Sequence, residues 1–290
     1  MEQTIQTTKK RKKKFEWGYL LLLPGIGYIV VFICIVSYLV FMQSIGYHNP
    51  IGEDGFTTEH WSMITSRIFR DSLLFSLRIG ILSSLISIVI CYPLALALQK
   101  SPGRKALLSI IKLPLFVPGL VGSFLIINII DFHGLLNQFL LWVGMIESPL
   151  RLRNDAAGIG VLAIHIWRFV PFQMVIMYSA IEGIRSDIKD AARNLGANGL
   201  GVLRHIIIPL TIPSALVAVI LVFIRTFNDF AIASTAGPIY PLSLAELMHV
   251  QAHRFHDWGG TAVVGVSMIF FAIAFVVLYT VLSKQIEKIS

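Results

Sequence analysis

Charged residues are scarce in this chain. Only 14% of its 290 residues are Asp, Glu, Lys or Arg, whereas 56% are hydrophobic and the mean hydropathy is +0.76. Soluble domains carry charge on about a quarter of their residues, so this chain has roughly half of what a water-facing surface requires. The composition excludes an ordinary soluble globular protein and a disordered chain. It indicates a polytopic membrane protein.

Cysteine is scarce too, and motifs typical of enzymes are missing. The two cysteines, Cys34 and Cys91, lie in long apolar runs and read as small hydrophobes, so neither a disulfide framework nor a thiolate metal cluster follows from them. The sequence has no paired-carboxylate motif, nucleophile elbow or intramembrane His-Glu zinc motif, which leaves an integral-membrane enzyme as a remote alternative. A channel is disfavoured because no sequence typical of a carbonyl filter or a charge ring is present.

Long apolar runs, by contrast, are plentiful. A membrane-spanning helix needs about 20 mostly apolar residues, and six such stretches predict an all-α integral membrane protein with six spans: Trp17–Gln43, Ser72–Leu98, Leu107–Ile130, Ala156–Ile181, Pro209–Ala233 and Thr261–Leu282. The segment Gly134–Met145 is too short to span, and we expect an interfacial or re-entrant helix there, with Trp142 at headgroup depth. Residues 1–16 are interpreted as a basic tail and residues 17–290 as one six-span domain.

Basic residues are distributed unequally between the two sides of these spans. Sixteen of the 24 Lys and Arg residues lie on the side that holds both chain ends, against five in the opposite loops. Because loops rich in Lys and Arg stay in the cytoplasm, the N and C termini are both predicted to be cytoplasmic. The largest basic block is Lys9–Lys14. Next to a first span, such a block is typical of a topology determinant near anionic lipid, so we expect no nucleic-acid partner.

The cytoplasmic loop between the fourth and fifth spans has the pattern of a short, complete helix. Asp187 is predicted to be its N-cap, with Asp190 three residues later completing a start that is similar to a capping box. Gly196 fits the left-handed position that follows a helix. Pro209 suits the first turn of the next helix, where its missing N–H would have no partner. One face of the short helix is apolar and is formed by residues at i, i+4 and i+7, namely Ile188, Ala192 and Leu195.

The same loop resembles the EAA loop of permeases in ATP-binding-cassette (ABC) importers. That family's pattern is Glu-Ala-Ala, three residues, Gly, nine residues and Ile-x-Leu-Pro. This chain has Asp190, Ala191, Ala192, Gly196, Ile206, Ile208 and Pro209 at matching spacing. Two residues depart from the pattern, since Asp190 stands in place of Glu and Ile208 in place of Leu. The resemblance covers the chain from about Leu20 onward and assigns residues 186–209 to the EAA loop.

The resemblance implies a permease subunit of a type I importer in a cytoplasmic membrane of bacterial type. Its loop helix would be a coupling helix, docked in a cytoplasmic ATPase subunit through Asp187, Asp190, Ala191, Ala192, Gly196, Ile206 and Pro209. A second permease, expected to be a different chain although a homodimer stays open, would complete the pathway, and an extracytoplasmic binding protein would deliver the solute. The sequence has no Gly-x-x-x-x-Gly-Lys-Ser/Thr phosphate loop. ATP and Mg are therefore expected on the ATPase partner, and no cofactor on this chain.

Polar residues within the spans are the candidates for a substrate pathway, because a charge at membrane depth is costly and is usually turned inward. Arg225 and Asp229 lie four residues apart in the fifth span and are able to pair, with Asn228 between them. Both a pathway-lining patch and an internal salt bridge fit this pattern. Arg168 in the fourth span lies three residues before Pro171, where bundle packing is favoured over contact with a ligand. Three phenylalanines lie near the patch in sequence: Phe223, Phe227 and Phe230.

Three histidines in the last outer loop have a spacing that is able to bind a metal. His249, His253 and His256 would share one helix face with Glu246. Solvated histidines are the favoured interpretation, because the positive charge of Arg254 lies among them. We therefore expect no metal.

The substrate is indicated only by local resemblances. Residues Gly134–Asn137 and Tyr92–Ala95 are similar to segments of permeases for polyamines and for related solutes such as phosphonates. Leu23-Pro24 and Ala236–Pro238 also occur in permeases for sugars and glycerol phosphate. We expect a small organic solute of the first group, with the second as the alternative.

Overall fold

The computed structural model describes residues 18–51 and 54–287, which form helices and no strands. The helices are α1 (Gly18–Ser44), η1 (Glu59–Thr65), α2 (Arg67–Lys100), α3 (Arg104–Ile111), η2 (Leu113–Phe116), α4 (Gly119–Ile130), α5 (Leu135–Trp142), α6 (Ile159–Glu182), α7 (Ser186–Asn194), α8 (Gly199–Val202), η3 (Leu203–Ile207), α9 (Ile208–Phe227), α10 (Ala231–Ala236), α11 (Leu244–His253) and α12 (Trp258–Glu287). Six helical segments of this part are long and apolar enough to cross a membrane, which confirms the predicted all-α, six-span fold. The basic tail lies outside the described residues.

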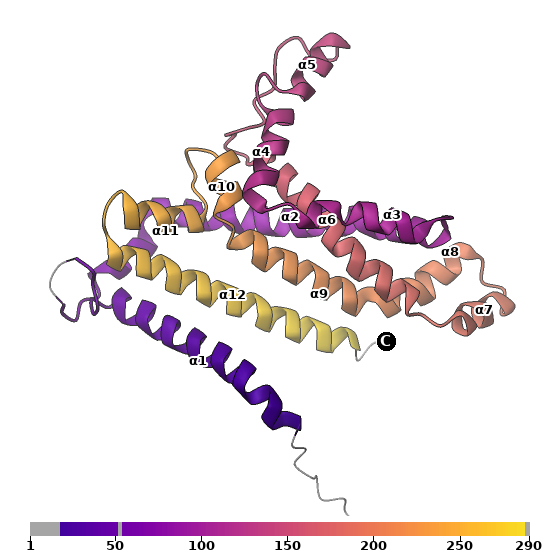
Figure 1. Ribbon diagram of the computed structural model, residues 1–290, viewed down its shortest axis with the longest axis horizontal. Coiled ribbons are helices and arrows are strands. Elements are labelled where there is room, and N and C mark those ends of the chain that lie inside the picture. The colour runs from indigo at the N-terminus through magenta and orange to yellow at the C-terminus, as the bar shows by residue number, and fades with distance from the viewer. Residues whose placement is uncertain (1–17, 52–53, 288–290) are drawn as a thin grey trace, which may run out of the picture.

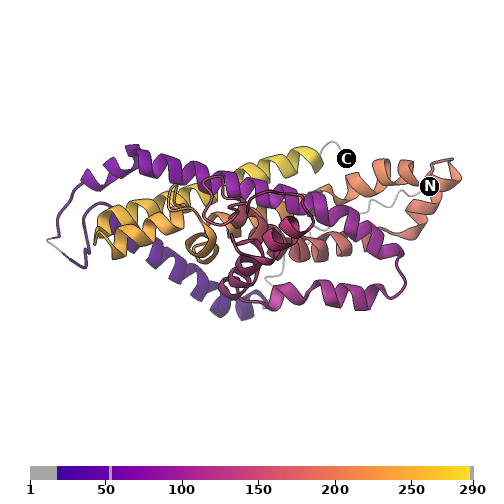
Figure 2. The same cartoon turned by 90° about the horizontal axis from the view of Figure 1, so that it is seen from above.

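Four long helices form the body of the molecule. Figure 1 shows α2, α6, α9 and α12 running roughly side by side, with α1 along the far edge of α12 and with α4 and α5 standing off the bundle as an arm. α2 packs on both α6 and α9, while α11 packs on α12. Two groups of elements gather at opposite ends of the bundle, with α7 and α8 at one end and η1 and α11 at the other (Figures 1 and 2).

The first turns of α1 and the last turns of α12 point toward the end that holds α7 (Figure 1). An even number of spans requires this arrangement, because each span reverses the side on which the chain emerges. Within the described residues, the start of α1 and the end of α12 thus lie toward the same end of the bundle as α7. Which side of the membrane this is remains a prediction from the distribution of Lys and Arg.

The buried face of α2 consists mainly of small residues. Five serines on it are nearly inaccessible to solvent: Ser72, Ser76, Ser83, Ser84 and Ser87. At Gly80, an added Cβ would come within 2.9 Å of the Phe223 ring of α9. In a membrane, helices associate by close packing rather than by expulsion of water, and small residues let two backbones approach. The small face therefore explains why α2 lies at the centre of the bundle.

Buried side chains also join α2 to its neighbours by hydrogen bonds. Gln173 of α6, which is fully buried, donates from Nε2 to the carbonyl of Ser84 at 3.2 Å and to that of Ala218 at 3.3 Å. One amide thus ties three helices together. Two further contacts join α2 to α9 between side chains: Ser83 with Thr226 at 3.2 Å and Tyr92 with Thr211 at 2.8 Å.

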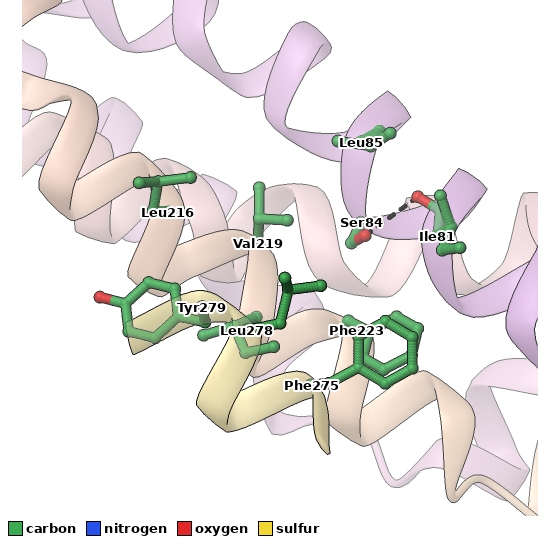
Figure 3. Close-up of a pocket in the computed structure, with 10 residues that line it drawn as sticks. Ile81, Ser84, Leu85, Leu216, Val219, Phe223, Phe275, Leu278 and Tyr279 are labelled. Carbon is green, nitrogen blue, oxygen red and sulfur yellow. Dashed lines mark hydrogen bonds between the residues drawn. The ribbon is translucent and has the colours of Figure 1, made fainter. Parts of the chain in front are cut away.

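Aromatic packing joins α9 to α12. The rings of Phe223 and Phe275 pack against one another (Figure 3), with their centroids 4.0 Å apart and their planes tilted by 44°. Phe227 is 1% exposed and also belongs to this core. Of the three phenylalanines near the predicted patch, two are therefore core residues, and Phe230 is the one with an accessible side chain, at 38%.

The predicted third span begins too early. Residues 107–130 do not form one helix, because the chain bends at η2, where Pro114 and Pro118 each remove a backbone donor. α3 is instead a separate helix of eight residues, and the apolar segment long enough to cross a membrane runs from Gly119 to Trp142. The short helix expected within residues 134–145 is confirmed as α5.

The predicted fifth span ends too late. α9 stops at Phe227, and the chain turns at Asn228 and Asp229 before α10 begins. At its other end the span is longer than predicted, because α8 and the π-helical η3 continue directly into α9. This break alters the geometry of the candidate pathway.

Removing the amide of Gln173 tests whether it stabilises the packing of α6 on α2 and α9. Gln173→Met keeps the approximate volume but removes both hydrogen bonds to α2 and α9, and we expect it to lower the free energy of unfolding by about 1 kcal/mol. The measurement is thermal unfolding of the purified protein in detergent. Gln138→Met is the control, because Gln138 is exposed and bonds only within its own segment, to the carbonyl of His133. Equal stability of the two variants would contradict the tie between the three helices.

Candidate functional site

α7 starts differently from the prediction. It begins at Ser186 after Arg185, and no side chain caps its first turn. The carboxylate of Asp187 lies beside Arg185 and accepts from the neighbouring N–H of Ile188, while Asp190 pairs with Arg193 at 2.7 Å. The predicted capping roles of Asp187 and Asp190 are therefore wrong, because both carboxylates are held by nearby arginines.

The end of α7 agrees with the prediction. Gly196 has a φ of +89°, in the left-handed region. Its N–H donates to the carbonyl of Arg193 at 2.9 Å, and the N–H of Ala197 donates to that of Ala192 at 3.0 Å. This pair of bonds is the Schellman motif, which satisfies the last carbonyls of a helix. Gly196 thus fixes the direction in which the chain leaves α7.

The apolar face of α7 is open to solvent in this chain. Leu195 is 90% exposed and Ile188 is 40% exposed, and Leu200 just beyond the turn is 70% exposed. Ala191 is also exposed, and Ala192 is half-buried. Large apolar side chains at a water-facing end of a membrane bundle are costly unless a partner covers them. This end of the molecule therefore has the character of an interface.

The loop is connected to α9 without a flexible joint. Ile206 lies in η3, and Pro209 is the second residue of α9, as predicted for a first-turn proline. Thr211, one turn later, donates to the carbonyl of Ile207 at 2.8 Å and also contacts Tyr92 of α2. α8, η3 and α9 are therefore continuous, and Thr211 joins this end of α9 to α2.

The candidate pathway residues surround the break between α9 and α10. Asn228 caps the end of α9, since its side-chain amide donates to the carbonyl of Ile224 at 2.9 Å. Asp229 turns toward α10, and its Oδ1 accepts from the N–H of Ile232 at 2.7 Å. A carboxylate in this place stabilises the start of a helix. The break therefore has its own side-chain hydrogen bonds.

The ion pair at this break is not the predicted one. Nη1 of Arg168 lies 3.8 Å from Oδ2 of Asp229, so the partner of the carboxylate comes from α6. Arg225 is instead placed over the Phe172 ring, with 5.2 Å from Cζ to the centroid. The expected pairing of Arg225 with Asp229 is wrong because the helix ends at Phe227, so the i, i+4 spacing no longer brings the two side chains together.

Two glycines of α4 pack against α6 beside this ion pair. A Cβ at Gly119 would overlap the guanidinium of Arg168, and one at Gly122 would come within 3.0 Å of the Trp167 ring. Close packing through small residues thus explains the glycines that follow Pro118. It also fixes Arg168 between α4 and the α9–α10 break.

The four candidate pathway residues differ in exposure. Arg225 and Asn228 are exposed, while the side chains of Arg168 and Asp229 are 28% and 15% exposed. Arg168 lies nine residues into α6, about 14 Å along its axis. Arg168 thus lies within a helix that is long and apolar enough to cross a membrane, where a lipid-facing charge would be costly. Arg168 and Asp229 contact one another, while Arg225 in the last turn of α9 and Asn228 at its C-cap are exposed.

The three histidines do not share a helix face. α11 ends at His253, and His256 lies beyond it with a φ of +52°. The rings of His249 and His253 lie against one another, with centroids 4.4 Å apart and planes tilted by 46°. Within residues 18–51 and 54–287, no group of three His, Cys, Asp or Glu residues is arranged to hold a metal ion.

Sequence analysis missed the buried polar residues that shape this site. Asn137 is 1% exposed and joins α5 to Leu150 by two hydrogen bonds of 2.9 Å. Gln173 and Thr226 hold α9 against α6 and α2 directly behind the break. The available signal was an uncharged polar residue within an apolar span, which is too common among membrane proteins to identify a site by itself.

Comparisons with known proteins agree with this architecture. The family model described as binding-protein-dependent transport system inner membrane component matches residues 88–288. The spermidine/putrescine transport system permease protein PotB of Escherichia coli (strain K12) is 26% identical over 267 residues, covering 91% of this chain and 96% of that protein. PotB of Salmonella typhimurium (strain SL1344) is 25% identical over 283 residues, covering 96% and 97%.

A solved structure has the same fold. The bacterial alginate ABC transporter in complex with an alginate pentasaccharide-bound periplasmic protein contains a chain that superposes with a TM-score of 0.76. The alignment covers 94% of this chain and 98% of that chain, at 18% sequence identity. Similarity at this identity concerns the arrangement of helices alone.

A double-mutant cycle can test which arginine interacts with Asp229. We expect Arg168→Gln and Asp229→Asn to be non-additive in thermal unfolding by about 0.5–1 kcal/mol, because each removes the same contact. Arg225→Gln and Asp229→Asn should be additive, since these side chains do not pair. Thermal unfolding of the singly and doubly substituted proteins in detergent supplies both cycles. Coupling between Arg225 and Asp229 alone would contradict the described geometry.

Proposed function

The chain belongs to the family of binding-protein-dependent transport system inner membrane components, and we propose that its solute is a polyamine-like organic cation. It is a multi-pass inner-membrane protein and a translocation-pathway subunit of an ABC importer. The solute, the partners and the role of each site residue are proposed below.

One observation supports the location of the pathway more than any other. Arg168 and Asp229 form an ion pair beside the α9–α10 break, and the exposed Arg225 and Asn228 lie in the last turn of α9 and at its C-cap. Interrupted helices with polar side chains are typical of solute sites near the middle of the bilayer. We assign these four residues to the surface along which the solute passes.

The polyamine assignment has two supports. The relatives at 25% and 26% identity are spermidine/putrescine permeases that align over nearly their whole length. In the site, Oδ2 of Asp229 makes only a long contact of 3.8 Å to Arg168, which leaves it able to receive an ammonium group. A carboxylate of this kind suits a cationic solute.

An anionic solute of phosphonate type is the second candidate. Arg225 is exposed, and its guanidinium contacts an aromatic ring rather than a carboxylate. A guanidinium presented to a pathway in this way suits a phosphonate group. The two candidates differ in which charged residue contacts the solute.

Three partners complete the proposed importer. An extracytoplasmic binding protein would dock at the end of the bundle with η1 and α11, and a second permease, different from this one, would cover the exposed Arg225 and Asn228. Cytoplasmic ATPase subunits would bind the apolar face of α7, where Leu195 is 90% exposed. ATP and Mg would be bound by these subunits, so this chain contributes no catalytic residue.

The solute can be identified by uptake into proteoliposomes that contain the full complex and its binding protein. We expect ATP-dependent uptake of spermidine, and Asp229→Asn should lower it by about tenfold, because a charged contact is lost. Arg225→Gln should change spermidine uptake by less than about twofold. Uptake of 2-aminoethylphosphonate that depends on Arg225, with no spermidine uptake, would reject the first candidate in favour of the second.

The role of α7 can be tested without disturbing the spans. Gly196→Val forces a β-branched residue into a left-handed conformation, which costs about 1–2 kcal/mol, and should redirect α7. Ala191→Asp places a charge on the proposed docking surface. Both changes should reduce uptake and ATPase activity by about tenfold or more, since a misdirected helix or an unpaired buried charge weakens docking.

Two matched substitutions serve as controls for α7. Gly199→Val makes the same change at a glycine that has ordinary φ and open space around its Cα. Ser186→Asp adds the same charge on the opposite face of α7, at the end where the helix dipole favours it. Full uptake by Gly196→Val and Ala191→Asp, with the ATPase still bound, would show that coupling occurs elsewhere.

A further inference from the structure

A cavity of about 460 Å³ lies beside the α9–α10 break, toward the end of the bundle opposite α7. It is bounded by residues of that break, of α11 and of the start of α12. Its lining is aromatic and apolar with few polar groups: Asn228, Phe230, Ala245, Met248, His249, Ala252, His253, Trp258, Thr261 and Met268. None of these lining residues, all within the described part of the chain, is Lys or Arg. The cavity adjoins the pathway residues but is not made of them, apart from Asn228.

Four rings form a continuous row along this cavity. The centroids of Phe230 and His249 are 4.7 Å apart, those of His249 and His253 are 4.4 Å apart, and those of His253 and Trp258 are 6.5 Å apart. The two histidines come from successive turns of α11, where they occupy one face. Phe230 follows Asp229 directly in the chain, so one end of the row is formed by the residue next to the proposed pathway carboxylate.

We propose that Phe230, His249, His253 and Trp258 form an aromatic ladder that receives an extended polyamine cation and guides it to Asp229. This inference rests on the proposed function, because it requires a cationic solute. It adds a second solute-binding site to the same subunit, between the point where the solute enters and the α9–α10 break. The ladder gives His249 and His253 a role other than metal binding.

Cation–π attraction is the chemistry that fits these rings. An ammonium group within about 6 Å of a ring centroid is attracted by the negative face of the ring, and the attraction grows when water is excluded. His249 and His253 are exposed and Phe230 is 38% exposed, so the rings are accessible to a solute rather than sealed in the core. Neutral imidazole presents such a face as well as a nitrogen acceptor for an N–H donor.

The spacing of the rings fits the spacing of charges in a polyamine. Amines separated by three or four methylenes lie roughly 5–6 Å apart in an extended chain, given ordinary carbon–carbon bond lengths. The ring separations of 4.4–6.5 Å therefore let successive ammonium groups contact successive rings. A compact anion would lack this match, and neither Lys nor Arg lines the cavity.

Carboxylates flank the ladder at both ends. Asp229 lies beside Phe230, and Asp257 lies directly before Trp258, where its Oδ1 is 3.7 Å from Nδ1 of His60. A cation that moves along the rings thus passes from one negative group toward another. Because the contact between Arg168 and Asp229 is long, at 3.8 Å, an arriving ammonium group competes for that carboxylate.

The ladder can be tested by exchanging rings for aliphatic side chains. The double variant His249→Leu/His253→Leu removes two rings, and His249→Phe/His253→Phe keeps them. Proteoliposomes with the full complex and spermidine-loaded binding protein supply two readouts, the spermidine taken up per ATP hydrolysed and the thermal unfolding temperature. We expect the Leu pair to lower this ratio by about threefold or more, as loss of two cation–π contacts implies. The Phe pair should stay within about twofold of the native protein.

Phe255→Leu is the matched control, because Phe255 lies in the turn after α11, is 68% exposed and does not line the cavity. This variant should transport normally. An unchanged ratio in the Leu pair, with spermidine uptake intact, overturns the ladder and leaves the proposed function standing. Equal losses in the Leu and Phe pairs, together with a lower unfolding temperature, also overturn it and indicate packing. A native complex that takes up 2-aminoethylphosphonate but no spermidine overturns both proposals.

Discussion

The helices of this protein must recognise one another without the hydrophobic effect, because lipid tails are as apolar as the side chains that face them. Close backbone contact and buried hydrogen bonds therefore have to hold the helices together. α2 meets this constraint with a face of serines and with Gly80, and Gln173 meets it by bonding to α2 and α9 at once. The position of every other span follows from this centre, since α6 and α9 pack on α2, and α12 packs on α9.

The same constraint explains how a polar site is tolerated at membrane depth. A helix that stops within the bilayer exposes backbone groups that no water can satisfy. At the α9–α10 break, the side chains of Asn228 and Asp229 bond to Ile224 and Ile232, so the interruption is stabilised locally. The carboxylate that caps α10 also meets Arg168. Stability of the break and chemistry of the pathway therefore depend on one side chain.

Sequence patterns predicted the features that depend on local physics. Apolar length identified the six spans, the left-handed glycine identified the end of α7, and Pro209 identified the first turn of α9. The failures have a common cause. In each case an arginine holds the carboxylate: Arg185 and Arg193 lie two and three residues from Asp187 and Asp190, whereas Arg168 reaches Asp229 from α6, a distance that the sequence does not reveal. The ladder was hidden for the same reason, because Phe230 meets α11 only through the tertiary fold.

The contact between α1 and α12 has a consequence for biosynthesis. α1 is translated before α12, which is its principal packing partner. Most of its described side chains are exposed, and none of the most apolar stretch of α1 is buried. During insertion, α1 must therefore remain solvated by lipid until α12 has been translated. A chain truncated before residue 258 would leave α1 without this packing partner.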